Sequence, residues 1–417
     1  MKGNTQEKKT QDRPRYVVGM DAHSRKLAIS VWDGTDRWNP ERYCQVRCFD
    51  IDALEKTYER HVPEDSITLI EASTNAGLLK QTLTGLGYRA EVIRPDAVSG
   101  KERRRKVCDA RDAENIALAY IHGDIREFVW TPDDECAECR ELLSAYRDCV
   151  KELTRTANRI WALCSRKGVR LDIRGGVTAP DAVRGMVEES GTEGVARRRL
   201  EMLARDYAGL MERRGELESV IAEYVFGNDV LVALMQLPGV NYLTAFATGA
   251  AVGDVGRFAK ASKLAAYGGF SPVLDTTGDE EERARRRGGT GKPLDGEGRR
   301  DLKFLYTEAG QTVLNTCADT PLGRWGWRML HRGKPKNKAA CAVGRKLLTY
   351  AWHVMRGDPT PNRTGEELFR RKLERFCSVL GKKRVAELGF ASRKDFAEHH
   401  ASRIYAALPQ ADAEGAV

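Results

Sequence analysis

Apolar residues in this chain follow two different periods, and the change near Pro132 restricts the fold to two dissimilar parts. Before it, short apolar runs at 16–20 (YVVGM), 27–32 (LAISVW) and 66–70 (SITLI) alternate with helical segments. After it, apolar residues recur at nearly heptad spacing in two long stretches. Short apolar runs are typical of buried strands, and heptad spacing is typical of packed helices. The pattern predicts an α/β part followed by an α part.

The α/β part is predicted to be layered. Two or three strands follow each other closely and are then succeeded by alternating strands and helices, which indicates an RNase-H-like fold. The predicted strands are Tyr16–Met20, Leu27–Trp32, Gln45–Phe49, Ser66–Ile70, Ala90–Ile93 and Phe128–Trp130. The predicted helices are Ile51–Arg60, Gly77–Leu86 and Asp109–His122.

The whole chain divides into five predicted segments. Residues 1–15 form a disordered lead-in, 16–132 the α/β domain, 133–229 a helical arm, 230–357 a mostly helical domain and 358–417 a charged helical tail. Two long helices packed as an antiparallel coiled coil are the simplest interpretation of the arm. Two amphipathic helices of a compact bundle fit the same pattern.

The charge of the chain favours a polyanionic partner. Lys and Arg number 69 against 60 Asp and Glu, which gives a net charge of +9, and an excess of this sign attracts nucleic acid. No stretch is long and apolar enough for a membrane span or signal core, and the ten cysteines form no disulfide framework. We expect a cytoplasmic protein. The basic runs lie at 101–106, 197–199, 283–287, 299–300, 370–372 and 382–384.

Four acidic residues stand where a catalytic site could form. Asp21 and Glu71 each follow an apolar strand directly, and Asp109 and Asp112 lie three apart at a helix start. The helix dipole alone could account for the last two, but it does not account for Asp21 or Glu71. Two Mg²⁺ ions about 4 Å apart, held by such oxygens, can activate an attacking oxygen and stabilise a leaving one at phosphorus. The set predicts two-metal nuclease chemistry.

The segments YVVGMDAH, ITLIEAS and KVCDARDAENIALAY resemble the DEDD, RuvC-like domain of one insertion-sequence transposase family. That family includes the Piv pilin-gene invertase and the bridge-RNA-guided recombinases. The resemblance implies that Asp21, Glu71, Asp109 and Asp112 are the metal-binding catalytic acids. The family pattern Lys-Thr-Asp-x-x-Asp-Ala is looser here, because Val107 and Cys108 replace the Thr.

The second domain resembles the C-terminal transposase domain of the same family through GRFAKASKLAAYGGFSPVLDTTG (256–278) and KNKAACAVGRKLLTYAWHVM (336–355). Family members carry a Ser before the Gly of this loop as the proposed nucleophile toward DNA, whereas Thr277 stands here. A threonine hydroxyl can attack phosphorus, although its methyl group crowds the approach. Thr277 is the first candidate and Ser271 the second, and loss of strand exchange is a third interpretation. The insertion DEEERARRR lengthens the loop.

Further residues are predicted to contact nucleic acid. The turn Leu237–Val240 reads as a helix-hairpin-helix element whose following helix offers N–H groups to a phosphate, although a plain turn between core helices fits equally. The basic runs beside the acids and in the loop are expected to contact phosphate, and a solvated charged surface is the alternative. The predicted residues are Arg103, Arg104, Arg105, Lys106, Gly239, Arg285, Arg286, Arg287 and Lys292.

The resemblance implies a recombinase that cuts and rejoins double-stranded DNA through a phospho-amino-acid link. Similarity to the bridge-RNA members implies a structured noncoding guide RNA as a partner. Because the acids and the hydroxyl are far apart in the sequence, we expect them to meet by domain docking in a homo-oligomer, a dimer or tetramer joined through the arm. Two other functions fit the residues. A Holliday-junction-resolvase-like nuclease would use the same acids with water as nucleophile. A domesticated homologue would bind DNA without cutting it.

Overall fold

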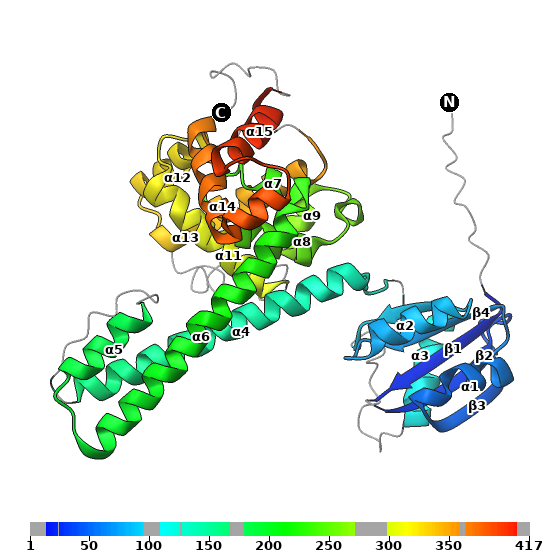
Figure 1. Ribbon diagram of the computed structural model, residues 1–417. Helices are drawn as coiled ribbons and strands as arrows, with labels where there is room; N and C mark the ends of the chain where they lie inside the picture. Colours follow the sequence, from blue (N-terminus) through cyan, green and yellow to red (C-terminus); the bar gives the residue numbers. More distant parts are fainter. Residues whose placement is uncertain are drawn as a thin grey trace, which may run out of the picture. The chain divides into compact units, whose positions relative to one another are not determined.

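The computed structural model describes residues 14–23, 25–95, 109–125, 127–166, 168, 179–271, 298–358, 360 and 363–406. They form two compact units, one ending at Asp133 and the other beginning at Asp134 (Figure 1). Within these ranges, no helix combines the length and apolar composition that crossing a bilayer requires.

The first unit contains a mixed five-stranded sheet, which confirms the predicted α/β fold. Its order is β3-β2-β1-β4-β5. The first three strands of the chain pair antiparallel, and β4 and β5 add to β1 in parallel. The strands are β1 (Tyr16–Ala22), β2 (Lys26–Asp33), β3 (Glu41–Asp50), β4 (Ser66–Glu71) and β5 (Arg89–Ile93).

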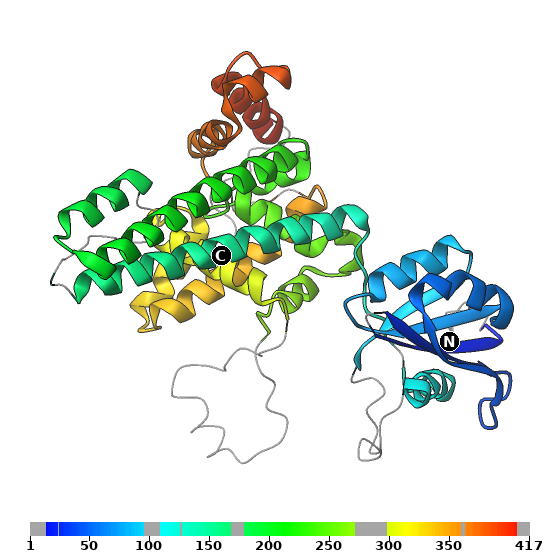
Figure 2. The ribbon, with the colours of Figure 1, turned by 60° about the horizontal axis from the view of Figure 1, so that its bottom comes forward.

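Helices cover both faces of this sheet. On one face lie α1 (Leu54–His61), preceded by the 3-10 turn η1 (Ile51–Ala53), and α2 (Ala76–Gly85). On the other lies α3 (Asp109–His122), as Figure 2 shows. Successive side chains of β1 point to opposite faces of the sheet, as in any strand. Val18 and Met20 pack with α1 and α2, and Val17 packs with α3.

One predicted strand is wrong. Phe128–Trp130 contributes a single bridge, in which Val129 pairs with Val92 of β5. A strand needs a backbone N–H and a carbonyl from each successive residue to pair with its neighbour. Pro132, two residues after Trp130, has no N–H and cannot continue such a ladder. The segment therefore touches the sheet edge at one residue and then leaves it.

The second unit begins with two long helices, α4 (Asp134–Ser165) and α6 (Gly194–Phe226), which pack side by side (Figures 1 and 2). The short helix α5 (Pro180–Glu189) packs against them. Their shared core confirms two packed long helices, while coiled-coil geometry stays a prediction. The start of α4 is tied to α8 (Tyr242–Val252), because Arg140 Nε and Nη2 donate to the carbonyls of Ala250 and Ala251 at 2.7 and 2.9 Å.

The remaining helices share one large apolar core. The last two, α14 (Glu366–Glu387) and α15 (Arg393–Ala406), come from the predicted tail. They contribute Phe369, Phe376 and Phe396 to the core, each almost fully buried. The other helices are α7 (Asp229–Leu234), α8, α9 (Ala261–Tyr267), α11 (Arg300–Thr316), α12 (Pro321–His331) and α13 (Lys336–Met355), with the 3-10 turn η3 (Val255–Arg257).

Candidate carboxylate site and C-terminal loop

Asp21 and Glu71 lie side by side at the C-terminal ends of two adjacent strands, β1 and β4. β1 and β4 are parallel neighbours, and Met20 pairs with Ile70 at the end of their ladder. The next residue on each strand is the acid. Residues in register on parallel strands point to the same face, and Val17, Ile67 and Leu69 of this face pack against α3. Both acids therefore belong to the α3 side of the sheet.

Helix α3 runs antiparallel to β1, so its first turn lies at the edge that holds these acids. Near its middle, Gly19 of β1 approaches so closely that a Cβ there would lie 1.8 Å from the Ala113 carbonyl oxygen. Near its end, Ile121 lies beside Val17 in the same core. From Gly19 to Asp21 the strand advances about 6–7 Å, and from Ala113 back to Asp109 the helix advances about 6 Å. Asp21 and the start of α3 thus stand level.

Asp109 and Asp112 continue the stripe of α3 that covers the sheet. They precede Ala113 and Ile116 by four residues each, and residues four apart share a face of a helix. The helix start is also tied to the sheet, because Gln45 Nε2 donates to the Ala110 carbonyl at 2.9 Å and Arg42 pairs with Glu114 at 2.6 Å. The fold brings the backbone of all four predicted acids to one end of the sheet.

The acids differ in their surroundings. Asp21 is only 8% exposed, whereas Asp112 and Glu71 are partly exposed. Asp109 begins α3, and its side chain lies outside the described part of the structure. Within the described part, no group of three His, Cys, Asp or Glu side chains is arranged to hold a metal ion. The donor chemistry nevertheless fits Mg²⁺, which prefers carboxylate oxygens and water.

Sequence reasoning missed His23. Its Nε2 lies 3.5 Å from Oδ2 of Asp21, and its side chain is 61% exposed. The sequence held only a weak signal, because His23 stands two residues after Asp21 and just beyond the end of β1 at Ala22. His23 thus places an imidazole beside a candidate acid.

The residues predicted to bind nucleic acid next to this site, Arg103, Arg104, Arg105 and Lys106, lie outside the described residues. The same holds for Thr277, Arg285, Arg286, Arg287 and Lys292 of the C-terminal loop. The structure does describe both ends of that loop, at Ser271 and Gly298.

The two ends of the loop are held together. The Arg299 N–H donates to the Tyr267 carbonyl at 2.7 Å. Gly298 has a φ of +96°, and a Cβ there would lie 2.7 Å from the Gly269 nitrogen. A side chain fits neither this backbone conformation nor this space. Ser271, the second candidate nucleophile, therefore stands two residues beyond a closed stem.

Asp301 fixes the second end of the loop at the start of α11. Its carboxylate accepts from Arg299 Nε at 3.0 Å and from the Leu302 N–H at 2.9 Å, and Arg147 of α4 lies 3.7 Å away. Burial alone would raise the pKa of Asp301, but the hydrogen bonds and charge of Arg299 outweigh it and hold the pKa below its usual value. The stem is thus anchored by an ion pair between the half-buried guanidinium of Arg299 and the buried carboxylate of Asp301.

We expect Asp301→Asn to destabilise the second unit by roughly 2–4 kcal/mol, because removing one partner of a buried pair leaves the other charge uncompensated. Urea unfolding would measure the loss. Asp319→Asn, at an exposed position beyond the same helix, is the matched control and should change little. Equal stability of the two variants would show that Asp301 does not hold the stem.

Comparison with known proteins gives a result for each of these regions. A DEDD transposase model matches residues 18–166, which include Asp21, Glu71, Asp109 and Asp112. A model described as the transposase IS116/IS110/IS902 family matches residues 232–292, which include the turn at Gly239 and Thr277. The chain belongs to the IS110 family of transposases. The family resemblance expected from the sequence is confirmed.

Two curated relatives of this IS110-family chain agree with that result. The transposase for insertion sequence element IS1111A of Coxiella burnetii is 27% identical over 216 residues, which are 51% of this chain and 58% of the relative. A probable family 20 transposase of Pseudomonas aeruginosa is 24% identical over 306 residues, 73% of this chain and 87% of the relative. The chain thus spans little more than half the length of the first relative.

The turn at Gly239 joins α7 to α8 within the family-matched region. Gly239 has a φ of +77°, and a Cβ there would lie 2.5 Å from the Ala309 carbonyl oxygen of α11. The ammonium of Lys372 donates to three carbonyls of the turn, those of Met235, Leu237 and Val240, at 2.7–3.0 Å. Burial lowers the pKa of Lys372 to about 8. Close packing explains this glycine, and its contact with phosphate stays a prediction.

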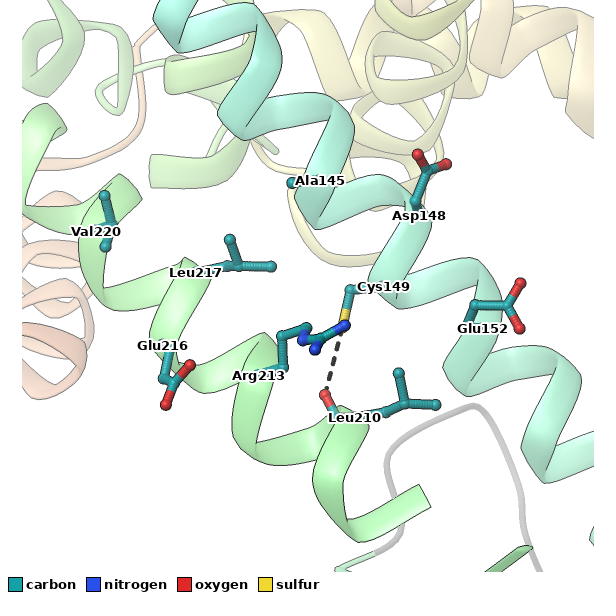
Figure 3. A pocket seen from close by; sticks show the side chains of 9 residues that line it. All are labelled: Ala145, Asp148, Cys149, Glu152, Leu210, Arg213, Glu216, Leu217 and Val220. Atoms are coloured by element: carbon teal, nitrogen blue, oxygen red, sulfur yellow. Dashed lines mark hydrogen bonds between the residues drawn. The ribbon is translucent and has the colours of Figure 1, made fainter. Parts of the chain in front are cut away.

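A groove between α4 and α6 is a poor candidate for a phosphate-binding site. It encloses about 620 Å³, and leucine side chains and Val220 line it together with three acids and Arg213 (Figure 3). Cys149 Sγ closes one side by donating to the Leu210 carbonyl at 3.3 Å. Because the carboxylates of Asp148, Glu152 and Glu216 outnumber the one cation, the groove does not suit a phosphate.

Proposed function

We propose that this IS110-family chain is a DNA transposase that cuts and rejoins DNA strands. The observation that carries the proposal is the meeting of Asp21 and Glu71, on adjacent parallel strand ends, with the first turn of α3. Family membership and the net positive charge support DNA as the substrate. A resolvase-like nuclease and a binding protein without activity are the alternatives that the experiment below must separate.

Asp21, Glu71, Asp109 and Asp112 would hold two Mg²⁺ ions. When bound, such ions supply charge neutralisation at the phosphate and a lower pKa for an attacking oxygen. Four carboxylates at one edge repel one another, and Asp21 is also buried, so a free cluster of anions would be costly. The meeting of the two strand ends with the first turn of α3 supports this assignment, because it brings the backbone of the four residues to one end of the sheet.

A hydroxyl of the second unit would be the nucleophile. Thr277 is the first candidate and Ser271 the second. The attacking hydroxyl gives its proton to solvent and forms an O–P bond. The bond from phosphorus to the leaving DNA oxygen breaks, and that oxygen takes up a proton from solvent, so that one strand end stays linked to the protein and the other ends in a hydroxyl. The reverse attack by another DNA hydroxyl would rejoin the strands. Both the acids and the hydroxyl must reach one phosphodiester, which is why we also propose a homo-oligomer.

We expect Thr277→Ala to abolish a covalent protein–DNA adduct, because it removes the attacking oxygen. The test mixes the full chain with end-labelled DNA and Mg²⁺ and resolves the products on a denaturing gel. Thr277→Ser should retain the adduct, because serine keeps the hydroxyl and lacks the crowding methyl. Ser271→Ala is the matched control.

Each result of this gel points to one function. An adduct that depends on Thr277 supports the recombinase, and one that survives Thr277→Ala but not Ser271→Ala moves the nucleophile to Ser271. Cleavage without any adduct supports the resolvase-like nuclease. Binding without cleavage supports a DNA-binding protein. A guide RNA remains a proposal from the resemblance, to be tested by sequencing RNA that copurifies with the chain.

A further inference from the structure

Two neighbouring helices and the turn that joins them carry a positive charge almost equal to the net charge of the whole chain. Residues 321–355 contain eight Lys and Arg and no Asp or Glu, so this stretch carries +8. The whole chain carries +9, which leaves +1 for the other residues. The stretch forms α12, a short turn and α13, and the two helices pack against each other. The basic runs recognised in the sequence lie elsewhere, and most are balanced by nearby acids.

The basic side chains of α12 gather on its outer side. Its buried residues, Leu322, Gly323 and Gly326, face the core. The opposite side is exposed and carries Arg324, Trp327, Arg328 and His331, at the spacing that places residues on one face of a helix. Arg332 follows directly and is exposed as well.

Helix α13 extends the same surface. Its buried positions include Ala340, Val343 and Leu347, and on its outer side Lys338, Arg345 and Lys346 are exposed. Lys346 crosses to α12, where its Nζ lies 4.3 Å from the centre of the Trp325 ring. This contact joins the two outer sides into one surface, which we call the α12–α13 face.

Most charges of this face are not neutralised by acids in the described structure, although Arg324 donates to the Asp319 carbonyl and Lys346 contacts Trp325. In other helices arginines at the surface pair with acids, as the half-buried Arg370 does with Glu366 and Glu398. By contrast, six cations of the α12–α13 face form no ion pair with any described residue. They are Arg324, Arg328, Arg332, Lys336, Arg345 and Lys346. Clustered like charges repel one another and reduce stability, so a surface of this kind suggests an external anion.

Trp327 adds a second kind of contact. Its indole Nε1 donates to the Leu314 carbonyl at 3.0 Å, which fixes the ring, while 40% of the side chain stays exposed. A fixed aromatic ring among arginines can stack on a base or pack on a sugar. Phosphates alone would not require it, so the surface suits a polymer with phosphates, sugars and bases.

We propose that the α12–α13 face binds the sugar–phosphate backbone of a nucleic acid. The inference rests on the charge and exposure of the second unit and does not depend on the carboxylates of the first. DNA and RNA present the same chemistry to such a face, and the experiment is arranged to tell them apart.

The test replaces Arg324, Arg328 and Arg345 together by Gln in the full chain. Fluorescence anisotropy then measures the affinity for a labelled DNA duplex and, separately, for a labelled RNA hairpin over a range of salt. We expect affinity for at least one of them to fall on the order of tenfold or more at fixed salt. The slope of log K against log salt should become shallower by about 2–3, close to one released counterion per lost phosphate contact.

Two further variants make the result specific. Arg371→Gln, Lys383→Gln and Lys394→Gln together remove the same charge from exposed positions on α14 and α15, and should retain most of the affinity. Replacing the same three arginines of the face by Lys keeps their charge and should restore binding. Loss with DNA alone or RNA alone assigns the partner. Equal affinities of the two Gln variants for the DNA duplex and also for the RNA hairpin would overturn the proposal.

The outcome is independent of cleavage. A chain with Asp21→Asn should still bind through the α12–α13 face. Failure of the binding prediction therefore leaves the carboxylate site untouched, and failure of the carboxylate prediction leaves this face untouched.

Discussion

Asp21→Asn is expected to lower DNA strand cleavage on the order of a thousandfold while leaving DNA affinity within about threefold, since metal and electrostatic contacts act mainly on the transition state. The substitution keeps the shape of the side chain and removes its charge. Of the candidate acids whose side chains are described, Asp21 is the most buried, and it stands level with the start of α3. Cleavage of end-labelled DNA in Mg²⁺ and anisotropy in its absence would measure the two quantities.

Asp52→Asn, at an exposed position of the same unit, is the matched control and should cut like the unaltered chain. Asp109→Ala should behave like Asp21→Asn, because the proposed function assigns both acids to one metal-binding site. Undiminished cutting by either variant would refute the assignment. Reduced cutting with an equal loss of affinity would instead indicate that the substitution disturbs the fold.

Gly19→Ala is expected to destabilise the first unit by roughly 2–4 kcal/mol, the range of overpacked or strained core positions. A Cβ at Gly19 would lie 1.8 Å from the Ala113 carbonyl oxygen and 2.8 Å from the Ala117 nitrogen. These are backbone atoms of α3, which cannot rotate away, so the helix must move off the sheet. Because α3 carries Asp109 and Asp112, cleavage should fall together with stability. Hydrogen exchange of residues 109–122 and urea unfolding would report both.

Gly77→Ala is the control for this prediction. Gly77 lies in α2, and nothing comes within 4 Å of a Cβ built there. An alanine should be neutral or stabilise the helix by up to about 1 kcal/mol. Unchanged protection of α3 in Gly19→Ala would mean that the close approach does not set the position of the helix.

The sequence was sufficient for the elements that carry the acids, because apolar periodicity is strong there. Helix α3 was predicted with the bounds it has, Asp109–His122. β1 extends beyond Met20 to Ala22, because Asp21 and Ala22 pair with Ala28 and Leu27. Asp21 is thus part of the ladder, a detail that depends on a partner strand and that local pattern does not contain.

Contacts between distant residues were out of reach. No pattern in the sequence near Gly19 predicts its contact with Ala113. Likewise, the ion pairs of Asp301 with Arg299 and Arg147 connect α11 and its N-terminal cap to α4. The α12–α13 face was missed for another reason. Its cations are spaced at helical intervals, not in runs, so a search for basic runs passes over them. The exposure of Trp327 also required the packed structure, since tryptophan near an amphipathic helix is more often buried.

The closed stem at Tyr267 and Arg299 has a consequence for how this protein can diverge. When both ends of a segment are pinned at one place, doubling its length costs only about 0.6 kcal/mol of closure free energy. The helices outside the stem need not adjust. The sequence between Tyr267 and Arg299, including the DEEERARRR stretch, can therefore change during evolution with little effect on the stability of the surrounding helices.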